Sequence, residues 1–321
     1  MKEFIDIKTP VVVPPLLPDS CRHQASHDES SRVQIRTAPD PLSLETLTAT
    51  LSDSPGPRLL VVNTVQNAAV IAQHLKDTWG QSAVEHVSTA LTPEHRANTY
   101  DRIRRRLRDR CDENWTLVAT SCVEAGVDFD FASGLRERAS LMSLLQLSGR
   151  VNRHGLRTRG PLLDFTLAPY PLFNKHPAFE QSALVLGELF REGKVEAKFC
   201  GDAFKRELDR ADIKPFLDQL RREENAQSFE TVEEIFRVIS ANTFTAVVRP
   251  ELTERINNFE PVPFRELQDG SVQLWLGKER DFQLPEIARL PGIYIWNLGY
   301  DPFIGVMRGM LELKRPGWSV L

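Results

Sequence analysis

The chain has 321 residues, a formal net charge of −4 and 26% charged residues, a composition that is ordinary for a water-soluble protein. No apolar run approaches the roughly 18 residues of a membrane span. The 4 cysteines stand far apart without a CxxC pair, so the sequence shows neither a zinc ligand set nor a disulfide framework. We therefore expect a cytoplasmic protein of two domains with reduced thiols, no metal site and no membrane partner. The net charge neither requires nor forbids nucleic acid, because the distribution of charge decides.

Residues 1–32 form the first segment, which we expect to be an arm or linker. Its prolines, the last of which is Pro18, prevent a regular element from crossing them, and a polar run follows. His27 and Asp28 form the dipeptide seen in metal-dependent phosphohydrolases. Neither a buried strand before it nor further histidine ligands accompany it, so we assign the pair to a solvated surface.

Between residues 33 and 170, short apolar runs alternate with segments of helical periodicity. Apolar runs bounded by turn residues favour buried strands, and apolar residues three or four apart favour helices. Strands that alternate with helices of this length predict an α/β fold with a mostly parallel, doubly wound sheet. The expected strands are 33–35, 59–62, 84–88, 117–120 and 161–167, and the expected helices are 42–51, 65–76, 92–107 and 140–149.

The helix expected at 92–107 has a strong start and a basic face. Thr92 is placed to be its N-cap and Pro93 its first residue. Its basic residues are arginine to the exclusion of lysine, which leaves two interpretations, a solvated face or a surface that binds nucleic-acid phosphates. The arginines concerned are Arg102, Arg104, Arg105, Arg106, Arg108 and Arg110.

The segment 117–155 contains the most informative polar residues. A buried strand is followed by a turn with Glu124, Gly126 and Asp128, which we expect at the carboxyl edge of the sheet, where parallel strands present functional groups. Gly126 lets the backbone approach a ligand closely. Asp128 is suited to accept hydrogen bonds from a sugar hydroxyl.

The helix after this turn has Ser140 as its expected N-cap and ends in two arginines. Gln146, Arg150 and Arg153 are spaced three or four apart and so share one helical face, which we expect at the same carboxyl edge. Guanidinium forks match phosphate oxygens and stabilise charge that develops on a transferring phosphoryl group. An isolated RxxR pair is usually solvated or salt-bridged, but here the strand, the Gly-Asp turn and the Gln-Arg-Arg helix follow one another in one short span.

These segments resemble a known family. VEAGVD at 123–128 looks like motif V of superfamily 2 helicases, and QLSGRVNR at 146–153 looks like motif VI. The segment ATSCVEAGVD, followed by RERASL and GRVNRHG, is similar to the corresponding segments of the helicase-nuclease recruited by type I CRISPR systems. The resemblance implies that 33–170 is a RecA-like lobe of the P-loop NTPase type, the second lobe of such a helicase.

The resemblance also implies roles for individual residues. Arg150 and Arg153 are expected to be arginine fingers toward ATP. Residues 59–64 correspond to motif IV, whose last two residues, Asn63 and Thr64, are implied to contact a DNA phosphate. From the sequence alone, a helix cap that binds no ligand is an equally good interpretation of these two residues. The implied nucleotide-binding residues are Gln146, Gly126, Asp128 and Glu124, and the implied DNA contacts are Asn63, Thr64 and Thr120.

After residue 170 the pattern changes. Residues 171–240 are expected to be a helical linker, with helices at 177–192 and within 203–240, and 241–321 an accessory α+β domain with strands near 244–249, 272–276 and 292–296. The family resemblance covers this part only loosely. Its aromatic residues are suited either to stack DNA bases or, as we favour, to fill a small core, and they are Trp275, Tyr294, Trp296, Tyr300 and Trp318.

Several motifs of a complete helicase do not occur in this sequence. It contains no GxxxxGK[ST] phosphate loop, no credible magnesium-binding acidic box and no nuclease metal cluster. We therefore expect the C-terminal part of an ATP-dependent single-stranded DNA translocase of CRISPR interference, inactive alone. Its expected partners are an N-terminal helicase-nuclease half, which holds Mg²⁺ with the ATP, single-stranded DNA and a Cascade-type effector complex. The alternative is a non-catalytic module that binds DNA or a defence complex without nucleotide.

Overall fold

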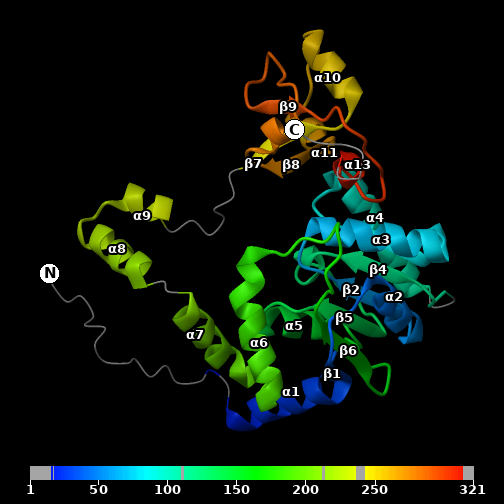
Figure 1. Cartoon of the computed structure of the whole chain (residues 1–321), viewed down its shortest axis with the longest axis vertical. Helices are drawn as coiled ribbons and strands as arrows, with labels where there is room; N and C mark the ends of the chain where they lie inside the picture. Colours follow the sequence, from blue (N-terminus) through cyan, green and yellow to red (C-terminus); the bar gives the residue numbers. More distant parts are fainter. Residues whose placement is uncertain (1–15, 17, 110–111, 212–213, 236–242, 314–321) are drawn as a thin grey trace.

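The computed structural model describes residues 16, 18–109, 112–211, 214–235 and 243–313. Within them a 6-stranded sheet and a separate 3-stranded sheet are formed. Helices cover both faces of the larger sheet, and the smaller sheet lies beyond α3 and α4 at one end of the molecule (Figure 1). The larger sheet with its helices is the α/β lobe that the sequence predicts.

All strand pairs of the larger sheet are parallel, in the order β1-β6-β5-β2-β4-β3. The central strands β2 and β4 place apolar residues on both sides of the sheet because both faces are covered. In β2, for example, Leu59 and Val61 belong to one core, whereas Leu60 packs in the core on the other face. The strands are β1 (Val33–Thr37), β2 (Arg58–Val61), β3 (Val84–Val87), β4 (Thr116–Ala119), β5 (Ser133–Glu137) and β6 (Gly160–Phe165).

The central strand β5 was not among the expected strands. Its sequence SGLRE looks like a polar turn, but Ser133 to Arg136 are buried, and Arg136 is only 1% exposed. The prediction of a turn that leads directly into the next helix was therefore wrong at 133–137. A strand with a charged residue in its middle does not have the apolar run on which the prediction relied, and only the partner of Arg136, described below, makes this burial tolerable.

One face of the sheet is covered by α2 (Leu44–Asp53) and α3 (Val65–Trp79). The other is covered by α4 (Pro93–Arg108), α5 (Leu141–Ser148), α6 (Glu180–Glu192) and α7 (Cys200–Arg210). The predicted N-caps are confirmed, because Thr92 accepts a hydrogen bond from the His95 N–H and Ser140 from the Ser143 N–H.

Part of the segment expected to be an arm or linker is helical. Helix α1 (Asp19–Arg32) begins directly after Pro18, where the prolines no longer prevent a helix. Its end is attached to the lobe, because Arg32 donates a hydrogen bond to the carbonyl of Arg153 over 2.8 Å. Residues 1–15 lie outside the described part of the chain.

The segment after the lobe forms helices and the small sheet. That sheet has the order β8-β7-β9, with one antiparallel and one parallel pair. None of the described helices is long and apolar enough to cross a membrane. The elements are α8 (Lys214–Asn225), α9 (Phe229–Ile235), β7 (Thr243–Val247), α10 (Pro250–Asn257), α11 (Phe264–Asp269), β8 (Ser271–Trp275), α12 (Lys278–Asp281), β9 (Ile293–Ile295) and α13 (Met307–Leu313).

Most of the described aromatic residues of this part pack inward, as expected. Trp296 is buried, and Tyr294 and Tyr300 pack against the same core. Trp275 is the exception among the described Trp and Tyr residues singled out above, because it is 61% exposed at the end of β8. Trp318 lies outside the described residues.

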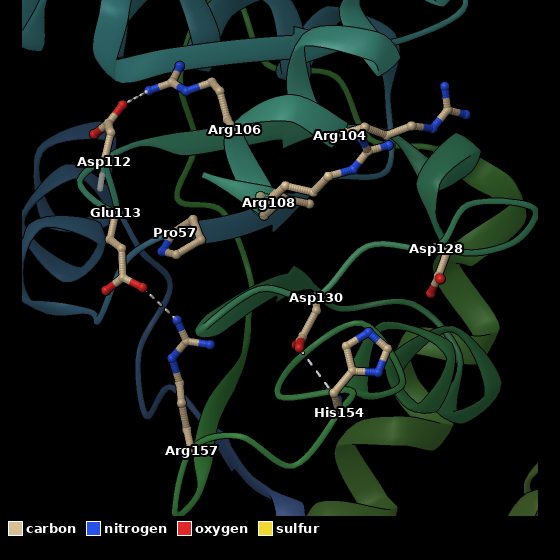
Figure 2. A pocket seen from close by; sticks show the side chains of 11 residues that line it. Pro57, Arg104, Arg106, Arg108, Asp112, Glu113, Asp128, Asp130, His154 and Arg157 are labelled. Carbon is tan, nitrogen blue, oxygen red and sulfur yellow. Dashed lines mark hydrogen bonds and ion pairs between the residues drawn. The ribbon is translucent and has the colours of Figure 1, made fainter. Parts of the chain in front are cut away.

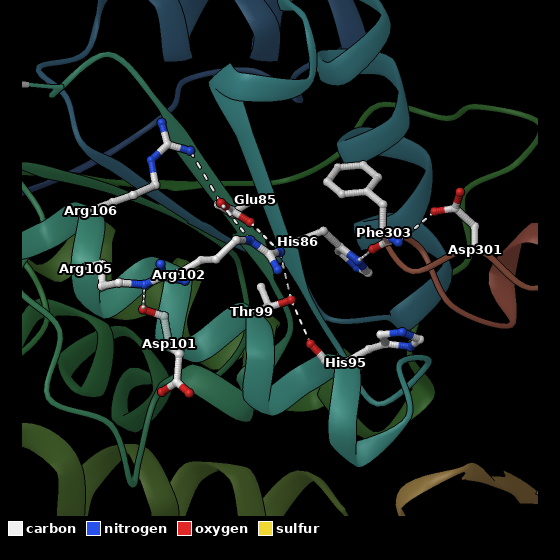
Figure 3. A network of polar contacts seen from close by, with 10 residues as sticks. All are labelled: Glu85, His86, His95, Thr99, Asp101, Arg102, Arg105, Arg106, Asp301 and Phe303. Carbon is white, nitrogen blue, oxygen red and sulfur yellow. Dashed lines mark hydrogen bonds and ion pairs between the residues drawn. The ribbon is translucent and has the colours of Figure 1, made fainter.

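Residues 300–307 attach this part to the lobe (Figure 3). His86 on β3 is 1% exposed, and its Nδ1 lies 2.6 Å from the carbonyl oxygen of Phe303. The Val306 N–H donates to the carbonyl of Ala90 over 3.1 Å. A carbonyl only accepts, so His86 carries its proton on Nδ1 and leaves a buried Nε2 without a hydrogen-bond partner among the described residues.

Acidification is expected to weaken the folded state through His86. Burial lowers the pKa of its ring to about 4, whereas the unfolded chain binds this proton below about pH 6.5. Between these values the unfolded state binds more protons, so this part of the stability is complete above pH 6.5. It then falls by up to about 1.4 kcal/mol per pH unit as the pH drops toward 4.

The measurement is the free energy of unfolding in urea at pH 7.5 and pH 5.5. His86→Asn keeps an N–H donor near the Phe303 carbonyl but cannot be titrated, so its free energy of unfolding should change less between the two pH values. If the free energy of unfolding depends equally on pH in the wild type and in His86→Asn, the proposed role of His86 is wrong.

Candidate functional site

The segment 120–132 crosses the lobe from one edge of the sheet to the other. It starts at Thr120, which follows the carboxyl end of β4, and it ends at Ala132, whose N–H donates to the carbonyl of Pro57 before β2. In between, Gly126 adopts a φ of +75°, which glycine takes without the usual cost, and it has open space around it. The predicted Gly-Asp turn is therefore part of a crossing between two edges.

Helix α5 ends at Ser148, so Arg150 and Arg153 follow the helix and do not share the helical face that was expected for them and Gln146. These residues after Ser148, the arginine end of α5, lie at the amino edge of the sheet. Phe131 and Val151 form a bridge just before β5, and the Phe131 N–H donates to the carbonyl of Arg150 over 2.9 Å. The expectation of a carboxyl-edge position for Arg150 and Arg153 was therefore wrong. A crossover helix begins near the carboxyl end of one parallel strand and has to return to the amino end of the next, so its last turn lies at the opposite edge.

Arg150 is held by the crossing segment. Its Nη2 donates to the carbonyl of Glu124 over 2.9 Å, and its Nε donates to the carbonyl of Val123 over 3.3 Å. Partial burial, together with the neighbouring charge of Arg153, lowers the pKa of Arg150. Two backbone carbonyls thus fix the direction of this guanidinium.

Arg153 and Asp128 form an ion pair at the same edge. The Nε of Arg153 lies 2.8 Å from the Oδ1 of Asp128, and their side chains are 37% and 73% exposed. An exposed pair of this kind is worth at most about 1 kcal/mol, so either partner is readily available to a ligand. Gln146 lies exposed on α5, one turn before Arg150.

Glu124 does not belong to this exposed group. Its carboxylate is 7% exposed, and its Oε1 lies 2.8 Å from the Nε of Arg136. Burial raises the pKa of Glu124, and the adjacent guanidinium opposes that shift. The carboxylate expected to bind nucleotide therefore faces the interior, because the charged residue of the unpredicted strand β5 needs a counterion.

Asn63, Thr64 and Thr120 follow the carboxyl ends of β2 and β4, which are neighbours in the sheet. The side-chain nitrogen of Asn63 donates to the carbonyl of Arg138 over 2.9 Å, and its oxygen accepts from Arg136 over 2.7 Å. The Thr64 hydroxyl accepts from the Asn67 N–H and caps α3, which is the helix-cap interpretation of this residue. The predicted DNA contacts and the predicted nucleotide contacts thus lie at opposite edges.

The loop that ends motif VI depends on two residues that sequence reasoning did not single out. Asn152 is 1% exposed at a φ of 45°, and its side-chain nitrogen donates to the carbonyls of Arg32 and Arg157. Asp130 accepts from the N–H of Arg153 over 2.7 Å. An asparagine between two arginines near a glycine was the available signal, since asparagine tolerates left-handed backbone.

The basic face of α4 is largely paired within the lobe (Figure 3). Arg102 and Arg106 both reach Glu85, at 3.0 and 3.4 Å, and Arg104 lies 2.6 Å from Asp101. These three guanidiniums therefore match the interpretation as a solvated, salt-bridged face. Arg110 lies outside the described residues.

A pocket of about 510 Å³ opens at the amino edge, between α4 and the end of motif VI. Figure 2 shows Arg108 on its α4 side and Asp130 with His154 on the other. The pocket also reaches Asp128, which places it next to the Arg153 pair. Among the described residues no group of three His, Cys, Asp or Glu side chains could hold a metal ion.

The loop around Arg153 provides a direct test of its anchoring. Asp130→Ala is expected to lower the free energy of unfolding by about 1.5–3 kcal/mol, because it removes a charged acceptor from backbone N–H groups. Amide hydrogen exchange at Arg153 and His154 should accelerate. Asp128→Ala is the matched control, since it removes only an exposed ion pair and should cost less than about 1 kcal/mol. Equal costs for the two variants would contradict this assignment.

Comparison with known proteins gives a consistent result. Residues 55–156 match the family model of the CRISPR-associated nuclease/helicase Cas3, C-terminal. The structure resembles T. fusca Cas3 crystallised with AMPPNP, with a TM-score of 0.57 and 14% identity over 83% of this chain and 39% of that chain. It also resembles a crystallised CRISPR-associated protein, with a TM-score of 0.56 and 16% identity over 86% of this chain and 41% of the other.

A third similar chain comes from a CRISPR RNA-guided surveillance complex described as pre-nicking, with a TM-score of 0.54 and 16% identity over 86% of this chain and 44% of that one. The chain thus spans roughly two fifths of the length of these solved proteins. No curated protein matches it. Residues 55–156, which contain β5, the crossing segment and the arginine end of α5, therefore match the Cas3 C-terminal family model, and the chain around them shares the RecA-like fold of the similar solved proteins.

Proposed function

We propose that this chain is the second RecA-like lobe and accessory C-terminal part of an ATP-driven single-stranded DNA translocase of CRISPR interference, acting in the cytoplasm. The observation that supports it most is that the family match includes Arg150, Arg153 and Asp128, which are gathered at one edge of the sheet. A separate N-terminal half supplies the phosphate-binding loop and the acidic residues for Mg²⁺. A Cascade-type effector complex is the proposed recruiting partner, as the similar chain in a surveillance complex suggests.

The residues at the amino edge fit one wall of a nucleotide site. Arg150 and Arg153 are two guanidiniums just after the end of α5, next to a pocket and partly open to solvent. When bound, ATP supplies the phosphoanhydride bond whose hydrolysis drives movement. In this chain, Arg150 and Arg153 would donate to phosphate oxygens, Arg153 after releasing Asp128 and Arg150 while it also holds the crossing segment in place. Asp128 would then be free to accept from a ribose hydroxyl.

The carboxyl edge fits a DNA backbone. Thr64 caps α3 and Ser140 caps α5, so the positive ends of two helices lie at this edge beside Thr120. Backbone N–H groups at helix N-termini favour phosphate oxygens. We assign single-stranded DNA to this edge, with Thr64 as a hydroxyl contact and Asn63 as the residue that positions it. Thr120 is only 7% exposed and its hydroxyl lies 3.5 Å from the Cys122 sulfur, so its contact with DNA requires this loop to move.

The experiment is reconstitution of the two halves. The chain is mixed with the N-terminal half of a solved relative or of its own system, and ATP hydrolysis is measured with and without single-stranded DNA. Hydrolysis that needs both halves and rises with DNA is the expected result. Hydrolysis by the N-terminal half alone that this chain does not change would overturn the proposal.

A second candidate function has one observation in its favour. Both arginines are already satisfied by the chain itself, through backbone carbonyls for Arg150 and through Asp128 for Arg153. In a module that binds DNA or a defence complex without nucleotide, both arginines would keep these contacts within the chain. DNA affinity that falls steeply with salt and does not respond to nucleotide, even with the N-terminal half present, would favour this candidate.

A further inference from the structure

The two edges of the lobe need a physical connection if DNA at one edge is to change hydrolysis at the other. The described residues contain a continuous series of polar contacts between them. It starts at Asn63, beyond the carboxyl end of β2, and ends at Arg150, at the amino edge. Each step is a hydrogen bond or an ion pair of 2.9 Å or less.

The first step joins Asn63 to β5. The side-chain oxygen of Asn63 accepts from the Nη1 of Arg136 over 2.7 Å, and the same Nη1 lies 2.7 Å from the carbonyl of Glu137. The N–H of Asn63 donates to the carboxylate of Glu137, also over 2.7 Å. A shift of the loop that presents Thr64 therefore cannot leave Arg136 unaffected.

The second step joins Arg136 to the arginine end of α5. Its Nε forms the buried ion pair with Glu124 at 2.8 Å, and the carbonyl of Glu124 accepts from Arg150 over 2.9 Å. Glu124 thus binds one arginine through its side chain and another through its backbone. Both side chains of the ion pair are less than a tenth exposed, so water does not weaken the contact.

Arg136 also has an unused donor. Its Nη2 is buried and has no hydrogen-bond partner among the described residues. A buried donor without an acceptor is unfavourable, so an arrangement that brings an acceptor to it is stabilised relative to this one. A shift of Asn63 or Glu124, the two residues that Arg136 already contacts, would provide such an arrangement, and the network would then have a second state.

We propose that Arg136 is a positioning residue that transmits the occupation of the DNA edge, through Glu124, to Arg150 at the nucleotide edge. This inference rests on the proposed function, since it concerns how DNA stimulates hydrolysis in the two-part protein. In this proposal the polar strand β5 connects the DNA edge with the nucleotide edge, a role that neither DNA binding alone nor ATP binding alone requires.

The test is Arg136→Lys in the reconstituted two-part protein. One ammonium cannot bind Asn63 and Glu124 together as the guanidinium fork does. We expect hydrolysis without DNA to stay within about twofold, and the stimulation by single-stranded DNA to fall roughly fivefold or more, the lower end of typical couplings between sites. DNA affinity and the KM for ATP, measured separately, should change less than the stimulation does.

Arg138→Lys is the matched control. Arg138 lies two residues away and also pairs with a buried carboxylate, that of Asp164 at 2.6 Å, but its side chain contacts neither Asn63 nor Glu124. A purely structural role of arginines that pair with buried carboxylates predicts the same effect for both variants. Coupling through Arg136 predicts lost stimulation for Arg136→Lys alone.

Thermal unfolding establishes that each variant is folded at the assay temperature. If Arg136→Lys does not fold, Glu124→Gln takes its place, because it keeps the volume and the backbone carbonyl but removes the ion pair, and it should also reduce the stimulation. Normal stimulation in a folded Arg136→Lys or Glu124→Gln protein would overturn the inference and leave the proposed function intact. A wild-type protein whose hydrolysis does not respond to DNA would overturn both.

Discussion

Replacing Arg150 and Arg153 together by alanine is expected to lower DNA-stimulated ATP hydrolysis in the reconstituted two-part protein by about 10³-fold or more. Arginine fingers contribute about 10³–10⁵ to the rate of phosphoryl transfer, because the catalysis consists mainly of positioning and charge stabilisation. The two guanidiniums are gathered at one edge of the lobe and are partly open to solvent.

The two arginines should not contribute equally. Arg150 donates to the carbonyls of Val123 and Glu124, so Arg150→Ala also loosens the crossing segment. The side chain of Arg153 is held by an exposed ion pair and a 3.4 Å contact to the carbonyl of Gly149, and its backbone contacts with Asp130 and Arg32 remain in Arg153→Ala, so this variant tests the charge with little structural change. Arg150→Lys keeps the charge but loses the fork and should remain strongly impaired.

The matched control is Arg104→Ala. Arg104 is exposed, lines the pocket at the amino edge and pairs with Asp101 on its own helix. Hydrolysis by this variant should stay within about twofold of the wild type, as for a surface pair. The measurement is the initial rate of phosphate release at saturating ATP and DNA. Unchanged hydrolysis in the double alanine variant would show that these side chains are not arginine fingers.

Glu124→Ala is expected to produce the largest loss of stability, about 3–5 kcal/mol in the free energy of unfolding. Removing one partner of a buried ion pair leaves the other charge without compensation. Arg136 is 1% exposed, and burial already lowers its pKa even with Glu124 beside it. Urea unfolding followed by circular dichroism measures the loss.

Two further variants separate the charge from the loss of packing. Glu124→Leu combined with Arg136→Met removes both charges at similar volume and should be more stable than Glu124→Ala, because buried pairs are often replaced by apolar residues without cost. Glu113→Ala removes an exposed carboxylate that pairs with Arg157 and should cost less than about 1 kcal/mol. A Glu124→Ala protein as stable as Glu113→Ala would show that the pair is not essential to β5.

The sequence predicted well those features that depend on neighbouring residues. Apolar runs predicted five of the six strands of the larger sheet, and Thr92 and Ser140 predicted the starts of α4 and α5. The wording of 123–128 and 146–153 predicted the family that the match over 55–156 supports. These signals are local, because a cap or an apolar run acts within a few residues.

Sequence patterns did not predict β5, the edge at which α5 ends, or the interior position of Glu124. Each of these depends on a contact between residues far apart in the chain or on the path of a crossover in space. SGLRE becomes a central strand because Glu124 compensates the charge of Arg136, and Arg150 lies at the amino edge because a crossover helix has to return there. The sequence alone determined the fold class of the lobe and the positions of its motifs. Which of the motif side chains are accessible to a ligand was decided only by the tertiary structure, because burial and ion pairing depend on the packing of the assembled core.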